Sequence, residues 1–146
     1  DGPKKVDPDN PCGLTVAVQR TTVSETDDVR PKKDACNGDL TVLSYDTGDN
    51  AALAVLMGRA DALSADSPVT AWAVNRSEGK MRQVGDMFQA SPYGFAVSKD
   101  SDLGKASAAA LQHLIETGEY AEILSRWGIE DGLIDQAMIN ERPING

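Results

Sequence analysis

An aspartate ends a short apolar stretch near the middle of the chain, in the run Arg59-Ala-Asp-Ala-Leu-Ser-Ala-Asp66-Ser-Pro68. Residues 60–65 predict a buried strand, and Ser67-Pro68 predicts a helix start directly after it. In open α/β sheets, ligands bind at the carboxyl ends of the strands, so Asp66 is placed to bind a cation such as an amino group. The alternative is that Asp66 only caps the helix, since aspartate and serine accept hydrogen bonds from the first helical amides and proline suits the first turn.

A second group of polar residues follows the first predicted strand. Residues 14–18 alternate and are rich in β-branched side chains, which predicts a strand. Residues 19–24 then bring amide and hydroxyl groups together, just before the acidic residues 25–28. A helix beginning there would present its first N–H groups and its positive dipole end to an anion. The alternative is a plain serine or threonine cap.

The elements that must position these two groups alternate along the chain. The patterns predict, in order, strands at 14–18 and 41–45, a helix at 51–57, a strand at 60–65 and a helix at 68–74. Asp49 or Asn50 is expected to cap the first helix, and Gly58 to end it. This alternation predicts an α/β fold in which a mostly parallel sheet is flanked by helices.

The pattern changes in the second half of the chain. Short strands are expected after residues 79–85 and at residues 91–97. Apolar residues then recur at helical spacing from Leu103 to Ile115, and Gly118 is expected to end this helix. A second amphipathic helix is predicted from Tyr120 to Trp127. Both helices carry apolar stripes that need a surface to pack against.

The chain length, the net charge and the lengths of the apolar runs disfavour several classes of function. At 146 residues, the chain is long enough to bury about 70% of its unfolded surface. Fourteen lysines and arginines against twenty-three aspartates and glutamates give a net charge of −9, so no nucleic-acid partner is expected. No apolar run reaches the roughly 18 residues needed to cross a bilayer. The first residues, Asp1-Gly-Pro-Lys-Lys5, do not resemble a signal peptide.

The two cysteines, Cys12 and Cys36, lie too far apart for a Cys-x-x-Cys redox or zinc motif. The single histidine, His113, falls on the polar side of its predicted helix and does not complete a metal site with them. A disulfide is predicted instead, and it would stabilise the fold by roughly 3 kcal/mol. It implies an oxidising, exported location. The alternative is two unrelated buried thiols, and no metal or cofactor is expected.

Four runs carry a resemblance to a known family: Val16-Ala-Val-Gln-Arg-Thr-Thr-Val-Ser24, Gly58-Arg-Ala-Asp-Ala-Leu-Ser-Ala-Asp-Ser-Pro68, Ser91-Pro-Tyr-Gly-Phe-Ala-Val-Ser-Lys99 and Gly118-Glu-Tyr-Ala-Glu-Ile-Leu-Ser-Arg-Trp-Gly128. In this order and spacing they resemble the extracytoplasmic solute-binding proteins of ABC-type amino-acid importers, the family 3 proteins of the type II periplasmic-binding fold. The paired cysteines look most like those of members from actinomycete-type Gram-positive bacteria.

Proteins of that family are two-lobed and clamp an amino acid between the lobes. The resemblance covers only the second lobe and the carboxyl-terminal helices, so the chain is expected to form one side of a clamp. It implies a linker or cut end at 1–11, the ligand-binding second lobe at 12–92, a returning hinge strand at 93–100, helices that dock on the first lobe at 101–128, and a tail at 129–146. Without a first lobe, the apolar stripes predict self-association or exchange of elements between copies.

The resemblance also assigns ligand contacts residue by residue. Asp66 matches the aspartate that pairs with the ligand α-ammonium, which leaves the capping role to Ser67. Thr22 and Val23 match positions whose hydroxyl or N–H reaches the α-carboxylate, and Gln19 matches a position that touches the ligand side chain. Thr21 stands where glycine is common and Ser24 where glutamine is common. Threonine disfavours positive φ more strongly than glycine does, which puts the family's turn at Thr21 in question.

The resemblance implies a binding module and not an enzyme. Its ligand would be a polar or charged amino acid, and its partner in the intact protein an ABC permease. The location would be extracellular or periplasmic, with a lipoprotein anchor. One alternative is the sensor domain of a membrane receptor. Another is a dehydratase on the same scaffold, with Asp66 in proton transfer, although no partner acid, base or nucleophile stands beside it in the sequence.

Overall fold

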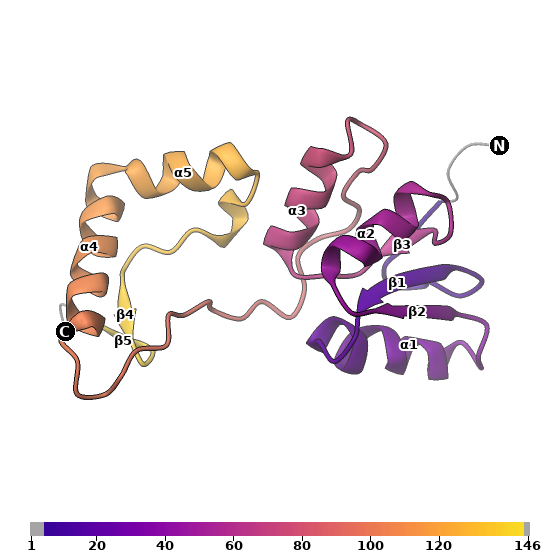
Figure 1. The fold of residues 1–146 in the computed structure, drawn as a ribbon, viewed down its shortest axis with the longest axis horizontal. Coiled ribbons are helices and arrows are strands. Elements are labelled where there is room, and N and C mark those ends of the chain that lie inside the picture. The colour runs from indigo at the N-terminus through magenta and orange to yellow at the C-terminus, as the bar shows by residue number, and fades with distance from the viewer. Residues whose placement is uncertain (1–4, 145–146) are drawn as a thin grey trace. The chain divides into compact units, whose positions relative to one another are not determined.

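The computed structural model describes residues 5–144, and the chain divides into two compact units, Asp1–Met87 and Phe88–Gly146. The first unit contains a parallel three-stranded sheet with helices, and the second contains two helices and a short hairpin (Figure 1). No helix among residues 5–144 is long and apolar enough to cross a membrane.

The sheet of the first unit has β1 (Thr15–Gln19) at its centre, between β2 (Thr41–Tyr45) and β3 (Ala62–Leu63). Both pairings are parallel, with Thr15 opposite Thr41 and Val16 opposite Ala62. This confirms the expected α/β fold with a parallel sheet. The strand expected at 60–65 is present but forms only two ladder positions.

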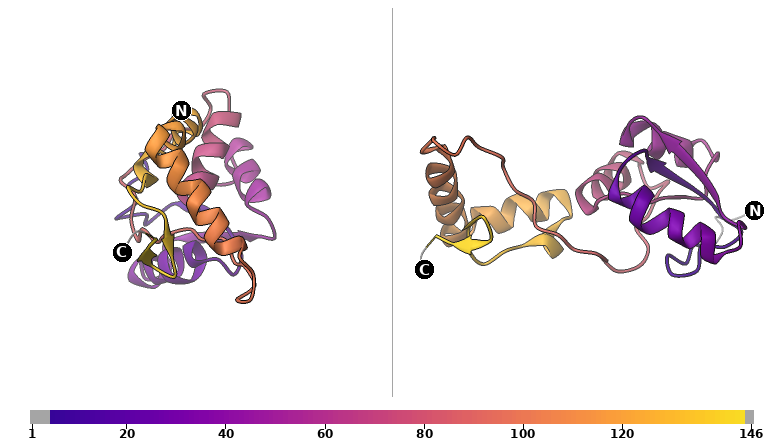
Figure 2. Two further views of the ribbon diagram at one scale, coloured as in Figure 1. Left: turned by 90° about the vertical axis from the view of Figure 1, so that its left-hand side faces the viewer. Right: turned by 90° about the horizontal axis from the view of Figure 1, so that it is seen from below.

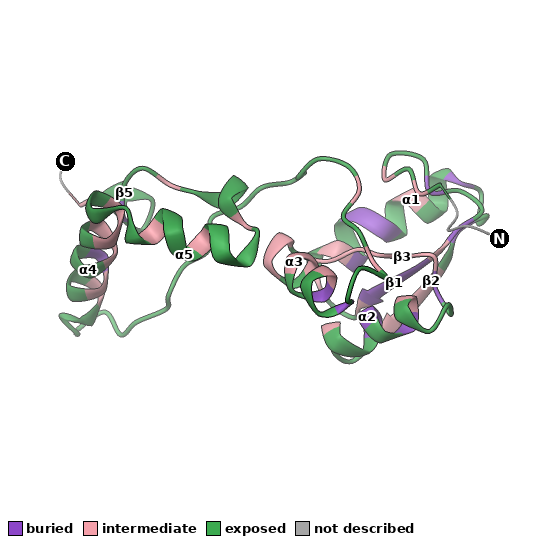
Figure 3. Cartoon of the chain, turned by 90° about the horizontal axis from the view of Figure 1, so that it is seen from above, coloured by how far each residue is buried: buried purple, intermediate pink, exposed green. Residues whose placement is uncertain are grey.

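Alternation along β1 builds a core on each face of the sheet, because successive side chains point to opposite faces. Val16 and Val18 join a cluster with Leu14, Val29, Cys36 and Leu40. Ala17 points to the other face, where it packs with Ala51, Ala54 and Ala60. β1 is therefore buried on both faces (Figure 3).

Helices connect the strands in the order that a parallel sheet requires. A π-helical turn, η1 (Ser24–Val29), continues directly into α1 (Arg30–Ala35), α2 (Gly48–Leu56) follows β2, and α3 (Ser67–Arg76) follows β3. The cap predicted for α2 was wrong. Thr47 has the extended backbone that a capping residue needs, and its hydroxyl accepts a hydrogen bond from the Asn50 amide at 3.2 Å, whereas Asp49 and Asn50 already lie within the helix.

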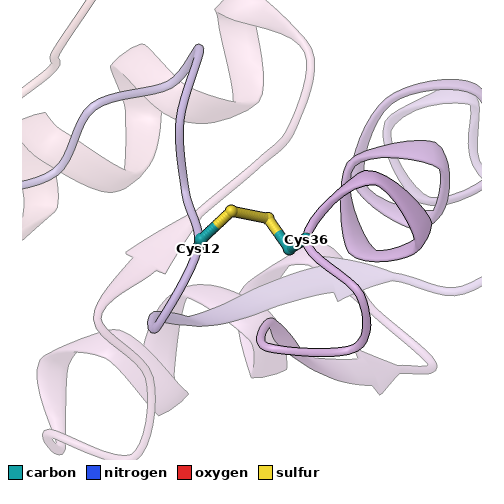
Figure 4. Close-up of a disulfide and its surroundings, with 2 residues drawn as sticks. All are labelled: Cys12 and Cys36. Atoms are coloured by element: carbon teal, nitrogen blue, oxygen red, sulfur yellow. A yellow bond between two sulfur atoms is a disulfide. The ribbon is translucent and has the colours of Figure 1, made fainter.

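A disulfide joins Cys12 to Cys36, as predicted (Figure 4). Cys12 lies shortly before β1, and Cys36 lies directly after α1 and before β2. The bond therefore ties the start of β1 to the connection that leads into β2. It lies on the amino-terminal side of the sheet.

The second unit contains α4 (Leu103–Thr117), α5 (Glu119–Trp127), the short 3₁₀ turn η2 (Glu130–Gly132) and a hairpin of β4 (Met138–Ile139) and β5 (Arg142–Pro143). Gly118 separates the helices in the left-handed conformation, with φ of 81°, as its predicted role requires. The hairpin lies beside α4 (Figure 2), and the Ala137 amide donates to Oε1 of Gln112 at 3.0 Å. His113 is exposed on α4, as expected.

The strands predicted after 79–85 and at 91–97 are not present, and no hinge strand forms at 93–100. Residues 81–98 contain neither helix nor strand. A strand requires a neighbour to complete its backbone hydrogen bonds, and the sheets found among residues 5–144 contain only β1 to β5. The boundary between the two units also falls earlier than the predicted end of the lobe at residue 92.

Candidate functional site

The carboxyl ends of the three parallel strands share one edge of the sheet. Gln19 at the end of β1 lies opposite Tyr45 at the end of β2. The amide of Ser64, just after β3, donates to the Ala17 carbonyl at 3.0 Å. The segments after the strands, which contain the predicted site residues, therefore begin at the same edge. This is the edge at which open α/β sheets bind ligands.

Thr21 adopts a left-handed backbone, with φ of 61°. The turn that its threonine put in question is therefore formed. For a β-branched residue, this conformation is an outlier that costs roughly 1–3 kcal/mol. The Thr21 amide donates to Oε2 of Glu25 at 2.6 Å, and its hydroxyl donates to the Arg20 carbonyl at 2.6 Å.

Thr22 and Val23 follow at the start of η1. The Thr22 hydroxyl donates to the Gln19 carbonyl at 2.7 Å, so its hydrogen is engaged within the loop. Val23 is the capping residue of η1 and is exposed. The first amides of a helix have no partner within that helix. At these two positions, the geometry therefore favours backbone N–H groups over the Thr22 hydroxyl as anion donors.

The side chain of Gln19, at the end of β1, reaches the residue that follows β2. Its Nε2 donates to the Asp46 carbonyl at 3.5 Å. A Cβ on Gly48 would lie 3.5 Å from Oε1 of Gln19 and 3.3 Å from Cγ1 of Val69. A Cβ at position 48 would thus be in ordinary contact with the Gln19 amide and in tight contact with Val69, so glycine relieves crowding mainly against Val69.

Asp66 lies at the capping position of α3 and is exposed. Its backbone carbonyl accepts the Thr70 amide at 2.9 Å, but its side chain makes no capping hydrogen bond. The expectation that Ser67 is the cap was wrong, since Ser67 is the first residue of the helix. The Asp66 carboxylate therefore does not perform the capping function that the alternative interpretation gave it.

Glu25 is a buried carboxylate behind this edge that the sequence analysis did not single out. Its Oε1 accepts the Ser44 hydroxyl at 2.5 Å and the Arg30 guanidinium at 2.7 Å, while Oε2 accepts the Thr21 amide. The Ser44 hydroxyl, the Thr21 amide and then Arg30 lower the pKa of Glu25 to about 2, against the opposing effect of burial. Glu25 therefore stays ionised and joins the turn after β1 to β2.

Asp28 is the second buried carboxylate, one turn further along. Its Oδ2 accepts the Ser64 hydroxyl at 3.0 Å, and its Oδ1 pairs with Nζ of Lys32 at 2.5 Å. Ser64 lies two residues before Asp66. Glu25 and Asp28 lie three residues apart, which places them on one helical face, and Asp28 directly precedes the apolar Val29. This spacing could have marked a buried face, but it does not identify the remote partners Ser44 and Ser64.

The remaining charges at this edge are exposed. Nε of Arg20 pairs with Oδ1 of Asp46 at 3.1 Å. Asp49, at the start of α2, lies 3.9 Å from the Arg76 guanidinium. No group of three or more histidine, cysteine, aspartate or glutamate side chains in the described part of the chain is arranged to hold a metal ion.

No family model matches this chain, but individual known proteins are similar to it. The arginine-binding protein ArgT of Corynebacterium glutamicum is 60% identical over 144 residues, which is 96% of this chain and 47% of that protein. A periplasmic His/Glu/Gln/Arg/opine family-binding protein from Silicibacter pomeroyi, solved in complex with lysine, is similar with a TM-score of 0.51 and 25% identity, over 88% of this chain and 56% of that one. The chain spans about half the length of the proteins it matches. Both similarities confirm the resemblance to solute-binding proteins.

Proposed function

We propose that this chain forms one side of an amino-acid clamp in an extracytoplasmic solute-binding protein of an ABC-type importer. The observation that carries the proposal is the 60% identity with an arginine-binding protein over nearly the whole chain. The shared sheet edge after β1 and β3, where Gln19, Thr22, Val23 and the exposed Asp66 carboxylate lie, supports it. Both similar proteins are named as binding proteins. We therefore propose that the chain binds its ligand and does not catalyse a reaction.

Each candidate residue has a part in this proposal. Asp66 pairs with the ligand α-ammonium, a charge-assisted contact of about 1.5–3 kcal/mol. The N–H groups of Thr22 and Val23 bind the α-carboxylate, aided by the positive end of the helix that begins there. Thr21 sets the turn that presents them, and the Gln19 amide contacts the ligand side chain.

We infer a cationic amino acid as the ligand, with arginine first. One relative is named for arginine, and the structural neighbour was solved with lysine. The net charge of −9 attracts cations from solution. At the site edge, the one arginine of the turn, Arg20, is already paired with Asp46.

The proposal includes a location and partners. The disulfide and the similarity to an amino-acid-binding protein support an exported location. The proposal includes anchoring to the membrane as a lipoprotein. The partners are the amino acid and an ABC permease, which the full-length protein would engage. Exposed apolar residues on α4 and α5, among them Leu103, Ile123 and Trp127, would make this chain by itself self-associate.

The test is ligand screening of the full-length protein that contains this chain. Calorimetry and thermal shift with arginine, lysine, histidine, glutamine and glutamate should show the largest rise in melting temperature with arginine, because a ligand that binds only the folded state stabilises it. The chain alone should bind weakly or not at all. Absence of binding to every amino acid by the full-length protein would refute the proposal.

A further inference from the structure

The turn after β1 contains a residue, Thr21, in a backbone conformation that its side chain disfavours. Thr21 has a positive φ although its side chain is β-branched, and such a backbone persists only where the surrounding structure holds it. The bond from the Thr21 hydroxyl to the Arg20 carbonyl is local to the turn. It does not fix the turn relative to the sheet.

The buried Glu25 carboxylate connects this turn to the sheet and to α1. It is 4% exposed, and its two oxygens hold three partners from different parts of the fold: the Thr21 amide, the Ser44 hydroxyl of β2 and the Arg30 guanidinium of α1. The contact to Thr21 is a hydrogen bond from a backbone amide to a carboxylate, which is stronger than one between neutral groups. The three contacts together fix the turn to the sheet and to the helix.

We propose that Glu25 is a positioning residue for ligand binding: by holding the Thr21 amide in a left-handed turn, it aims the N–H groups of Thr22 and Val23 at the ligand carboxylate. This inference rests on the proposed function. It concerns a residue that does not touch the ligand and acts through the turn.

A matched carboxylate exists at the opposite edge of the same sheet. Oδ2 of Asp61 accepts the Thr15 amide at 2.8 Å, at the start of β1. Both Asp61 and Glu25 hold a backbone amide of the β1 region, one at the amino end and one at the carboxyl end. Asp61→Asn therefore controls for the loss of a structural carboxylate away from the site.

The main experiment compares Glu25→Gln with Asp61→Asn in the full-length protein, with L-arginine as the probe. Glutamine keeps the shape, but only its carbonyl oxygen can accept, so the three donors lose part of their contacts. Glu25→Gln should weaken arginine binding about tenfold, whereas Asp61→Asn should change it less than twofold. Both variants are compared at 25 °C after circular dichroism has shown that they are folded. Equal effects on affinity would overturn the proposal and leave Glu25 as a fold-stabilising residue.

A rescue variant makes the test specific to the turn. Glycine adopts positive φ without the side-chain penalty, so Thr21→Gly should restore most of the affinity that Glu25→Gln loses. No recovery in the double variant would overturn the turn-holding role. The Asp61→Asn background should show no comparable effect of Thr21→Gly.

A readout without ligand separates this inference from the proposed function. Hydrogen exchange of the peptide that covers residues 19–23 should be about tenfold faster in Glu25→Gln than in the unaltered protein, whatever the protein binds. Unchanged exchange would overturn the positioning role. Failure of the unaltered protein to bind any amino acid would instead refute the proposed function.

Discussion

The two edges of the three-stranded sheet are built differently. At the amino edge, the Cys12–Cys36 disulfide and the bond from the Thr15 amide to Asp61 fasten the start of β1. At the carboxyl edge there is no covalent tie among the described residues, and the turns are held by hydrogen bonds to the buried Glu25 and Asp28.

The groups left at the surface of the carboxyl edge differ as well. Asp66 is exposed and its side chain makes no capping bond to α3, and Val23 is exposed at the start of η1. The two edges therefore have different roles: the amino edge secures the fold, while the carboxyl edge presents polar groups in a fixed geometry. We therefore expect substitutions at the amino edge to change stability and substitutions at the carboxyl edge to change binding.

The largest effect on stability is expected from the disulfide. Replacing both Cys12 and Cys36 by serine should lower the free energy of unfolding by about 3 kcal/mol, since the bond restricts the unfolded chain. Affinity for arginine in the full-length protein should change less than twofold at temperatures where it stays folded. Urea unfolding and calorimetry measure the two quantities, and a parallel loss of affinity would contradict the separation of the edges.

The largest effect on binding is expected from Asp66. Asp66→Asn should weaken arginine binding by about tenfold to a hundredfold, because a charge-assisted contact of about 1.5–3 kcal/mol becomes a neutral one. The variant should still fold, and its melting temperature without ligand should show no loss of a helix cap, since the Asp66 side chain makes no capping bond. The control is Asp34→Asn on the exposed end of α1, which removes the same charge and should leave affinity within twofold. Equal losses in the two variants would refute a ligand role for Asp66.

Residues that lie next to strand ends and residues that have remote partners differed in how well the sequence predicted them. Asp66 was predicted as a site residue because local patterns locate the end of a strand and the start of a helix, whereas Gln19 was assigned through the family resemblance. Glu25 and Asp28 were missed because their partners are remote: Ser44 lies 19 residues from Glu25, and Ser64 lies 36 residues from Asp28. Nothing local indicates those pairings.

The backbone of Thr21 and the absence of a strand at 93–100 also depend on contacts that the local sequence does not reveal. The left-handed backbone of Thr21 opposes its own side-chain preference and is held by Glu25, a contact that side-chain propensity alone does not reveal. The strand expected at 93–100 was recognisable as a pattern, but a strand forms only where a neighbour pairs with it. Periodicity located the three strands of the first unit's sheet and its helices, but it did not show which strand-like segments lack a pairing neighbour, nor the turns and long-range contacts.

The pH dependence of stability should reveal the carboxylate behind the carboxyl edge. The pKa of Glu25 is lowered from an ordinary value of 4.5 to about 2, mainly by the Ser44 hydroxyl, with the Thr21 amide and Arg30 adding to it. The unfolded chain therefore binds a proton at higher pH than the folded chain does. The stability that Glu25 contributes is complete above about pH 4.5 and is lost progressively as the pH falls towards about 2.

Urea unfolding between pH 7 and pH 2.5 measures this loss. Glu25→Gln should flatten the acid side of the profile, because glutamine does not titrate. Its neighbours Asp28 and Lys32 form their own ion pair and remain in both proteins, so the difference between the two profiles isolates Glu25. Identical profiles would contradict the hydrogen bonds of Glu25 to Ser44, Thr21 and Arg30.

The smallest effect concerns the turn itself. Thr21→Gly should raise the free energy of unfolding by about 0.5–1 kcal/mol, since a β-branched residue at positive φ costs roughly 1–2 kcal/mol more than glycine, and the greater freedom of glycine in the unfolded chain offsets part of that gain. The control is Glu78→Gly: Glu78 also has a positive φ, of 52°, but it lies just beyond the end of α3. Both variants should gain stability in urea unfolding, and neither should change arginine affinity more than twofold while Glu25 is intact. If Thr21→Gly instead lost affinity with Glu25 present, the threonine side chain would itself be needed at the site, and the carboxyl edge would depend on the side chain of its turn as well as on its backbone.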